Sequence, residues 1–203
     1  MTDTNITAEI TEEKISNQCT DVIYPQVTGL PDRAVEGRIN SLIKDTVTRQ
    51  IPPEGCDVYR EIYGRYRVGV NRNGILSIIL SVYTIRQHAA NGLDVQKAIT
   101  VNLNTGKVYQ LHELFKNTSD YRIVISRMIQ EQIEERELPL LKEFTGITDY
   151  EEYYLTENNL VIYFQEITYF PHSAGIQEFP IPYSQIRNLV RSDSPIGLLL
   201  QDP

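Results

Sequence analysis

Three histidines, His88, His112 and His172, are the side chains best suited to acid–base or metal chemistry in this chain. Ser173 follows His172, but a nucleophilic triad needs a nucleophile, a histidine and a carboxylate that converge in space. Neighbours along a chain rarely meet in that geometry. The G-x-S-x-G turn that exposes a serine nucleophile in many hydrolases is also missing from the sequence. We therefore assign no catalytic residue.

Metal and cofactor sites find equally little support in the sequence. His88 and His172 fall in expected loops and could approach each other together with Asp94 or Glu166. They lack the i,i+4 spacing that places two ligands on one helix face, and loop histidines of this kind are more often ordinary hydrogen-bonding groups. The glycines of the central region lie between strands and not before a helix, so they predict no phosphate-binding loop. We expect no metal and no cofactor.

The charge balance limits the class of partner. The 203 residues include 27 acidic and 19 basic side chains, which gives a formal net charge of −8. Such a chain is repelled by phosphate backbones, so nucleic acid is disfavoured, whereas basic partners are attracted. Acidic domains are also simply soluble, and charge alone does not separate the two interpretations. Adjacent glutamates such as Glu151 and Glu152 indicate solvated surface, because glycosidase carboxylates are not recognised by adjacency.

Cys19 and Cys56 are the only cysteines and form no CxxC or His/Cys cluster of the kind that binds zinc. They can form one disulfide in an oxidising compartment or remain reduced in the cytoplasm, and we expect the bridge if the chain is exported. No stretch approaches the roughly 20 apolar residues of a transmembrane helix. Residues 1–5 lack the basic end and apolar run of a signal peptide. The chain is either cytoplasmic or begins after a removed export segment.

Hydrophobic periodicity predicts sheet and helix in the first half of the chain. Alternation at residues 6–10 indicates a strand, residues 18–24 could form a second strand that ends before Pro25, and helical spacing marks a helix over 32–49. The pattern that follows predicts an antiparallel meander with a turn at Asn73-Gly74. Its three strands are expected at residues 58–70, 75–85 and 93–103. In the meander, residues 58, 62, 66, 68 and 70 are expected on one face.

The second half is expected to contribute more helix. A helical turn at 111–115 precedes a helix capped by Thr118 or Ser119. The remaining elements are a short helix at 151–154, strands at 159–165 and 177–181, and a helix at 183–190. We predict one α+β domain over residues 1–203, a mainly antiparallel sheet with helices packed on one face. Residues 5–50 would form a companion N-terminal segment and residues 57–190 the main region.

Two expected loops carry most of the residues suited to recognition, and loops carry recognition more often than the scaffold beneath them. The candidate ligand-binding residues are Arg86, His88 and Asn91 in the first loop, and Tyr169, Phe170, Pro171 and His172 in the second. The aromatic–proline–histidine run could instead plug the end of the sheet. As a binding surface, both loops would lie at the same edge with Tyr169 or Phe170 partly accessible.

A series of short motifs resembles a bacterial envelope domain family. The resemblance rests on their order and spacing: Gly74-Ile75-Leu76-Ser77-Ile78, Tyr83, His88-Ala89-Ala90-Asn91-Gly92, residues 101–107, residues 111–115, residues 159–164, Ala174-Gly175 and residues 179–183. Similar domains occur in the extracytoplasmic region of the anti-sigma-V factor and before the catalytic domain of certain peptidoglycan deacetylases. The resemblance covers most of residues 5–190.

The resemblance implies an α+β fold, an extracytoplasmic place in a Gram-positive envelope and, in the anti-sigma case, recognition of a muramidase (lysozyme). Lysozymes are basic, which suits an acidic receptor. The sequence departs from the family at residues 86–92, where the common Gly-Gly-Ala-His-Gly loop keeps only a His and a Gly in other surroundings. It also contains no transmembrane helix, sigma-binding segment or deacetylase domain.

The favoured hypothesis is a non-enzymatic binding or sensing module of the cell envelope. Its partner would be a protein, such as a basic muramidase, or a cell-wall ligand. Two alternatives stay open: a cell-wall hydrolase or metal-dependent enzyme, and a cytoplasmic structural protein with the same fold. Histidines that lie far apart in the structure would weaken the enzyme hypothesis.

Overall fold

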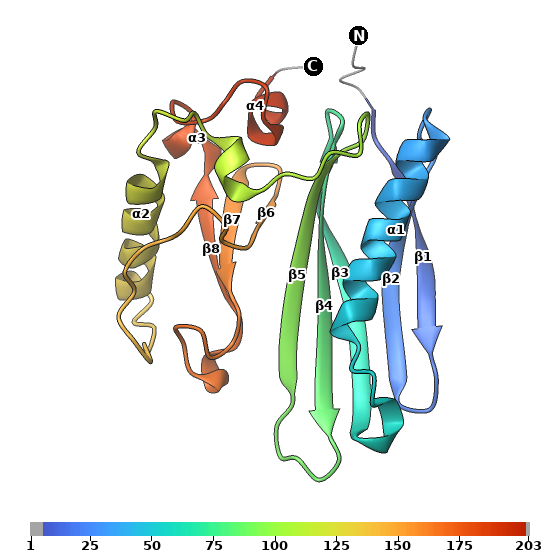
Figure 1. Ribbon diagram of the computed structural model, residues 1–203. Helices are drawn as coiled ribbons and strands as arrows, with labels where there is room; N and C mark the ends of the chain where they lie inside the picture. Colours follow the sequence, from blue (N-terminus) through green and yellow to red (C-terminus); the bar gives the residue numbers. More distant parts are fainter. Residues whose placement is uncertain (1–5, 202–203) are drawn as a thin grey trace.

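The computed structural model describes residues 6–201, which form four layers in the order helix, sheet, sheet, helix (Figure 1). The first sheet holds five strands in chain order: β1 (Glu9–Ser16), β2 (Thr20–Thr28), β3 (Tyr59–Arg72), β4 (Ile75–Arg86) and β5 (Leu93–Asn102). The second holds β6 (Tyr153–Leu155), β7 (Asn159–Phe164) and β8 (Gln177–Pro182).

Two longer helices cover the outer faces of this double sheet. Helix α1 (Arg33–Gln50) lies on the first sheet, and α2 (Tyr121–Glu135) lies on the second (Figure 1). Shorter elements connect and close the fold: the 3-10 turns η1 (Gly55–Asp57), η2 (Leu111–Leu114) and η3 (His172–Ala174), and the helices α3 (Tyr183–Ile186) and α4 (Pro195–Leu199).

The order of the first sheet follows from the lengths of its connections. Short turns join β1 to β2, β3 to β4 and β4 to β5, and each of these pairs is antiparallel. Asn73 and Gly74 adopt φ of 52° and 72° at the β3–β4 turn, as a two-residue hairpin requires. Helix α1 connects β2 to β3, which are parallel. The predicted meander is therefore confirmed.

Strand β4 is buried on both faces, as its continuous apolar run predicts. Leu76, Ile78 and Leu80 belong to the core beneath α1, whereas Ile79 packs against the second sheet. On α1, buried residues recur at every fourth position from Val35 to Val47, and the Asp32 side chain accepts hydrogen bonds from the backbone of the first turn.

The predicted α+β class with a mainly antiparallel sheet is confirmed, and α1 covers one face of the first sheet. On the opposite face, the second sheet packs against β3, β4 and β5, and α2 lies beyond it, so the helices do not share one face, contrary to the prediction. β1, β2 and α1 share a core with β3–β5. The single-domain organisation over residues 1–203 stays a prediction.

Residues 151–154 do not form the predicted short helix. Tyr153, Tyr154 and Leu155 are buried and form β6, which pairs with β7. The Leu155 amide also donates to the Ser77 hydroxyl of β4 at 2.9 Å. A three-residue strand has too few residues for a recognisable period, so its tertiary contacts decide its conformation.

The structure also differs from the prediction at the end of β2 and at the start of α2. β2 continues through Pro25 to Thr28, because its pairing with β3 ends at Val22 and Pro25 has no amide to supply on that side. The residue before α2 is Asp120, in place of Thr118 or Ser119.

Helix α3, predicted over residues 183–190, is shorter than predicted. It ends at Ile186, because the following residues leave the helix to contact the segment around η2. The Lys116 amide donates to the Leu189 carbonyl at 2.9 Å, and the Arg191 amide donates to the Leu114 carbonyl at 3.0 Å. Helix α4, which the sequence did not predict, follows this contact.

A β-bulge at residues 68–70 reverses the faces of β3. Ile62 packs in the core beneath α1, whereas Val70 packs in the core of the second sheet. The prediction that both share one face is therefore wrong. An inserted residue moves every later side chain to the opposite face.

The two sheets approach closely where β6 crosses β3. A Cβ atom on Gly69 would lie 2.2 Å from the backbone oxygen of Leu155. Gly37 in α1, by contrast, has no atom within 4 Å of such a Cβ. A methyl group therefore meets backbone at Gly69 and open space at Gly37.

We expect Gly69→Ala to lower the free energy of unfolding by about 1–3 kcal/mol, because backbone must move to admit the methyl group. Gly37→Ala, the matched control, should raise it by about 0.5–1 kcal/mol through the higher helix propensity of alanine. Urea denaturation of both variants measures the difference. A Gly69→Ala protein as stable as the wild type would contradict the close contact between β3 and β6.

Candidate functional site

The first predicted loop, residues 86–92, joins β4 to β5 at one end of the first sheet (Figure 1). Arg86, His88 and Asn91 are exposed, as a binding role requires. His88 has a φ of 62°, and the Ala89 amide donates to the Arg86 carbonyl at 3.2 Å. The loop is thus a tight turn that presents three polar side chains to solvent.

A disulfide anchors the base of this loop. Cys19 and Cys56 are bonded, with an S–S distance of 2.07 Å and Cα atoms 5.5 Å apart. The Gln87 side-chain amide donates to the Cys56 carbonyl at 3.3 Å, and the Gln87 backbone amide donates to the Val58 carbonyl at 2.8 Å. The sequence left open whether the two cysteines are bridged or reduced, and in this structure they are bridged.

The second predicted loop follows β7 and contains η3. Phe170 is fully buried at 0% exposure, with ring centroids 6.4 Å from Phe164 and 5.9 Å from Phe179. Its assignment as a ligand-binding residue is corrected, because a core side chain does not reach a ligand at the surface. Tyr169 and Pro171 are half-buried, and the Tyr169 ring packs edge-on against Phe164 at 5.0 Å.

His172 is held by a buried carboxylate. Its Nδ1 atom lies 2.5 Å from Glu166 Oε2, and the Glu166 side chain is only 5% exposed, whereas that of His172 is 39% exposed. Burial raises the pKa of Asp94 at the start of β5, the negative charge of Glu166 raises it further, and His172 opposes this rise. Asp94, two residues after the first loop, is therefore within electrostatic reach of the Glu166–His172 pair of the second loop.

The three histidines do not form a common site. His172 lies in η3 at the same end as residues 86–92, whereas His112 belongs to η2 toward the opposite end (Figure 1). The His112 ring contacts Tyr150 edge-on, with centroids 5.5 Å apart. Across residues 6–201, no group of three or more His, Cys, Asp or Glu side chains is placed to hold a metal ion.

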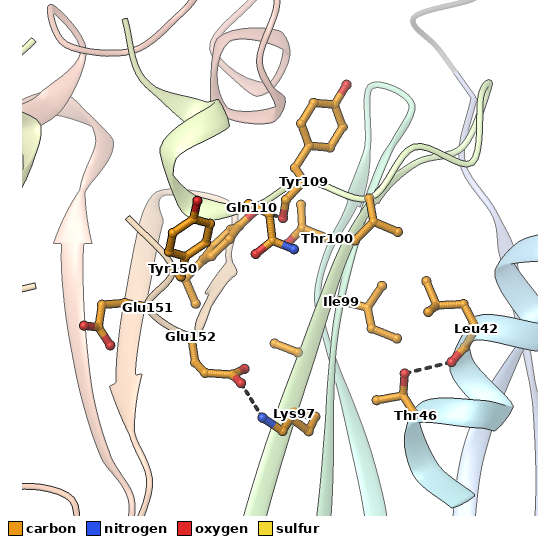
Figure 2. A pocket seen from close by; sticks show the side chains of 13 residues that line it. Leu42, Thr46, Lys97, Ile99, Thr100, Tyr109, Gln110, Tyr150, Glu151 and Glu152 are labelled. Carbon is orange, nitrogen blue, oxygen red and sulfur yellow. Dashed lines mark hydrogen bonds and ion pairs between the residues drawn. The ribbon is translucent and has the colours of Figure 1, made fainter. Parts of the chain in front are cut away.

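A cavity of about 250 Å³ lies between α1, β5 and the second sheet (Figure 2). Glu152 points into it and is bonded to the Lys97 ammonium group. Tyr163 donates its hydroxyl proton to the other Glu152 oxygen at 2.7 Å. Burial, reinforced by the Glu152 charge, raises the pKa of Tyr163, so the hydroxyl remains a donor.

These contacts correct the interpretation of Glu152 as solvated surface. Its two oxygens link β5 to β7, because Lys97 belongs to one strand and Tyr163 to the other. Both oxygens are engaged with protein groups. The cavity therefore contains a structural bridge between the sheets and not a free acid–base pair.

Sequence reasoning considered Asp94 and Glu166 near His172 only as metal ligands, whereas the structure pairs Glu166 with His172 and leaves Asp94 within their electrostatic influence. It also missed exposed apolar side chains beside the second loop: Leu140, Leu141 and Ile167 are 39%, 55% and 58% exposed. No local pattern predicts either feature, since each depends on how the second sheet is placed against the first.

Known proteins resemble this chain in sequence and in fold. Residues 112–184 match a family described as "Protein of unknown function (DUF3298)". Over 202 aligned residues the chain is 28% identical to the anti-sigma-V factor RsiV of Bacillus subtilis (strain 168). This chain resembles the anti-sigma-V factor. The alignment covers 90% of this chain and 68% of that protein, so the predicted resemblance is confirmed.

Solved structures share the fold at much lower identity. A DUF3298 family member from Bacteroides fragilis NCTC 9343 is 12% identical with a TM-score of 0.74, covering 98% of this chain and 100% of that one. Another from Pseudomonas aeruginosa PAO1 is 15% identical with a TM-score of 0.66, and 99% of each chain is covered. Within residues 6–201, no helix is long and apolar enough to cross a membrane.

The disulfide should contribute substantially to stability. It joins residues 37 positions apart, and the loss of unfolded-chain entropy from closing such a loop corresponds to about 4 kcal/mol. We expect the double variant Cys19→Ser/Cys56→Ser to lose roughly that amount in urea denaturation. The wild type treated with a thiol reductant should match it, and the variant should not respond to reductant. A wild type indifferent to reduction would contradict a stabilising bridge.

The raised pKa of Asp94 predicts a pH dependence of stability. The folded protein binds this proton more tightly than the unfolded chain, whose carboxyl has the ordinary value of 3.8. Ionised Asp94 therefore destabilises the fold at neutral pH, and the penalty disappears as pH falls through the window between the raised value and 3.8.

We expect Asp94→Asn to raise the free energy of unfolding at neutral pH, with the gain shrinking as the solution becomes acidic. Asp45→Asn on the exposed face of α1 serves as the control, because it changes the same charge where nothing buries it. Urea denaturation across the acidic range measures both. A gain for Asp94→Asn that grows on acidification would show the opposite sign and refute the argument.

Proposed function

We propose that this chain is an extracytoplasmic binding or sensing module of the cell envelope, and that its ligand is a basic protein of the muramidase type. The observation that carries the proposal is the 28% identity to the anti-sigma-V factor across 90% of the chain. An alignment of this extent includes both sheets and both loops. An alignment over this length is stronger support for a shared mode of recognition than the match of one short motif would be.

Charge supports the choice of a basic ligand. The chain has a formal net charge of −8, and opposite charges steer association and select among partners. The proposed contact residues are the exposed Arg86, His88 and Asn91 together with the partly accessible Tyr169, Pro171 and His172. They come from two loops at one end of the fold (Figure 1). Phe170 supports that surface from beneath.

An extracytoplasmic location is supported by the Cys19–Cys56 disulfide, because such bridges persist in oxidising compartments. A non-enzymatic role is supported by the state of the candidate acid–base groups. Glu152 is bonded to Lys97 and Tyr163, and Glu166 is bonded to His172. These carboxylates stabilise the arrangement of the two sheets and the second loop.

The proposal is tested by titrating the purified chain with a basic lysozyme in a calorimeter, with an acidic muramidase as the matched ligand control. We expect binding of the basic protein that weakens as salt is added, since screening reduces electrostatic attraction. The chain alone, assayed on peptidoglycan without lysozyme, should show no hydrolysis. Absence of binding, or turnover by the chain alone, would defeat the proposal.

Tyr169→Ala should weaken lysozyme binding by about 2 kcal/mol or more if this ring is a central anchor. Tyr150→Ala is the control, because Tyr150 is 73% exposed and lies beside His112 and away from both loops. Circular dichroism verifies that both variants are folded. His88→Ala, at an exposed position, provides a second test that does not disturb packing. Unchanged affinity in Tyr169→Ala and His88→Ala would remove these loops from the interface.

A further inference from the structure

Ile167 combines two features that rarely occur together. It lies between β7 and η3 with a φ of 64°, in the left-handed region. Its side chain is 58% exposed. β-branched residues strongly disfavour this backbone region. Because the Ile167 side chain is largely exposed, its burial does little to offset the energetic cost of the conformation. The conformation is therefore imposed by the surroundings of the residue and not by its own preference.

The surroundings that impose it are rigid on both sides. The Ile167 amide donates to the Phe170 carbonyl at 3.1 Å, and the Thr168 amide donates to the Gln165 carbonyl at 3.2 Å. Phe170 is fixed in the core, and Glu166 is bonded to His172. The tight turn at residues 165–170 therefore holds Ile167 outward. Strained positions of this kind cluster at ligand-binding sites, where the strain presets a contact.

A second exposed apolar segment lies beside this turn. The Leu141 amide donates to the Tyr169 carbonyl at 2.7 Å, so residues 140–141 run along the second loop. Leu140, Leu141 and Ile167 are 39%, 55% and 58% exposed, and we call these three residues the apolar patch. The partly buried Tyr169 ring lies against the core between the two segments.

We propose that the apolar patch is the anchoring site for an apolar side chain presented by a basic protein ligand. This inference rests on the proposed function and adds to it the residues that would make the central contact. Apolar anchors surrounded by polar groups dominate the energetics of protein interfaces. Ile167 and Leu141 would supply that anchor in place of Phe170.

Charge decides among the occupants of the patch. Glu166 precedes Ile167 in the chain and acts electrostatically on Asp94, so two carboxyl groups lie at this end of the fold, and Lys142 lies 4.7 Å over the Tyr169 ring. A second copy of this chain would bring another net charge of −8 to the contact. An anionic lipid surface would be repelled in the same way. A protein that flanks its apolar side chain with lysine or arginine fits both the patch and the net negative charge of the chain.

The test uses the full chain with Ile167→Asn, because asparagine tolerates the left-handed region while removing the apolar side chain. We expect the unfolding midpoint to stay the same or rise, while the affinity for basic lysozyme falls at least about tenfold. Leu141→Ser should show a similar loss. Ile123→Ser, which removes a 71% exposed isoleucine on α2, should leave the affinity within about twofold.

Each outcome has a distinct meaning. Wild-type affinity in both Ile167→Asn and Leu141→Ser, with lysozyme still bound, overturns the apolar patch and leaves the proposed function standing. No binding of the wild type to any basic protein overturns both. A change in self-association of the variants, measured by sedimentation velocity without a change in lysozyme affinity, would assign the patch to a second copy and overturn the occupant proposed here.

Discussion

The docking of the second sheet on β3–β5 is the contact on which the rest of the structure depends. Its apolar part consists of a small cluster of Ile79 with Tyr154, Val161 and Tyr163, and of Val70 and Ile75, which join the core of the second sheet. Hydrogen bonds define its register. The Gln165 side-chain amide bonds to both backbone groups of Gln96, with 3.1 Å between the Gln96 nitrogen and the Gln165 oxygen. A side chain thus occupies the place of a neighbouring strand at the edge of β5 and protects that edge.

Polar groups inside this contact favour one arrangement because each would be costly to bury alone. The fully buried Ser77 hydroxyl lies 2.9 Å from the Thr100 hydroxyl and accepts from the Leu155 amide at 2.9 Å. Glu178 of β8 bonds to Arg67 at 2.7 Å and to Tyr154 at 3.0 Å. A shift of one residue between the sheets would break these bonds together, so the polar contacts select the register that the small apolar cluster leaves open.

Local periodicity was sufficient to predict the meander and α1, because their signals lie within single segments. The second sheet was predicted only as isolated strands, since β6 spans three residues and is defined by partners on β4 and β7. The loop site shows the same division. Sequence reasoning found both loops, but Phe170 proved to be core and the exposed Ile167 was overlooked, because composition alone does not reveal which side chain of an apolar run faces solvent.

The binding end owes its geometry to anchors that lie outside its exposed side chains. Residues 86–92 are tied to the disulfide segment through Gln87, and the second loop is fixed by Phe170 in the core and by the Glu166–His172 pair. The two loops belong to different sheets, so their relative position follows from the sheet docking. Exposed positions such as His88 and Ile167 can therefore change without loss of these anchors. Such a division lets ligand specificity vary while the fold that presents it stays constant.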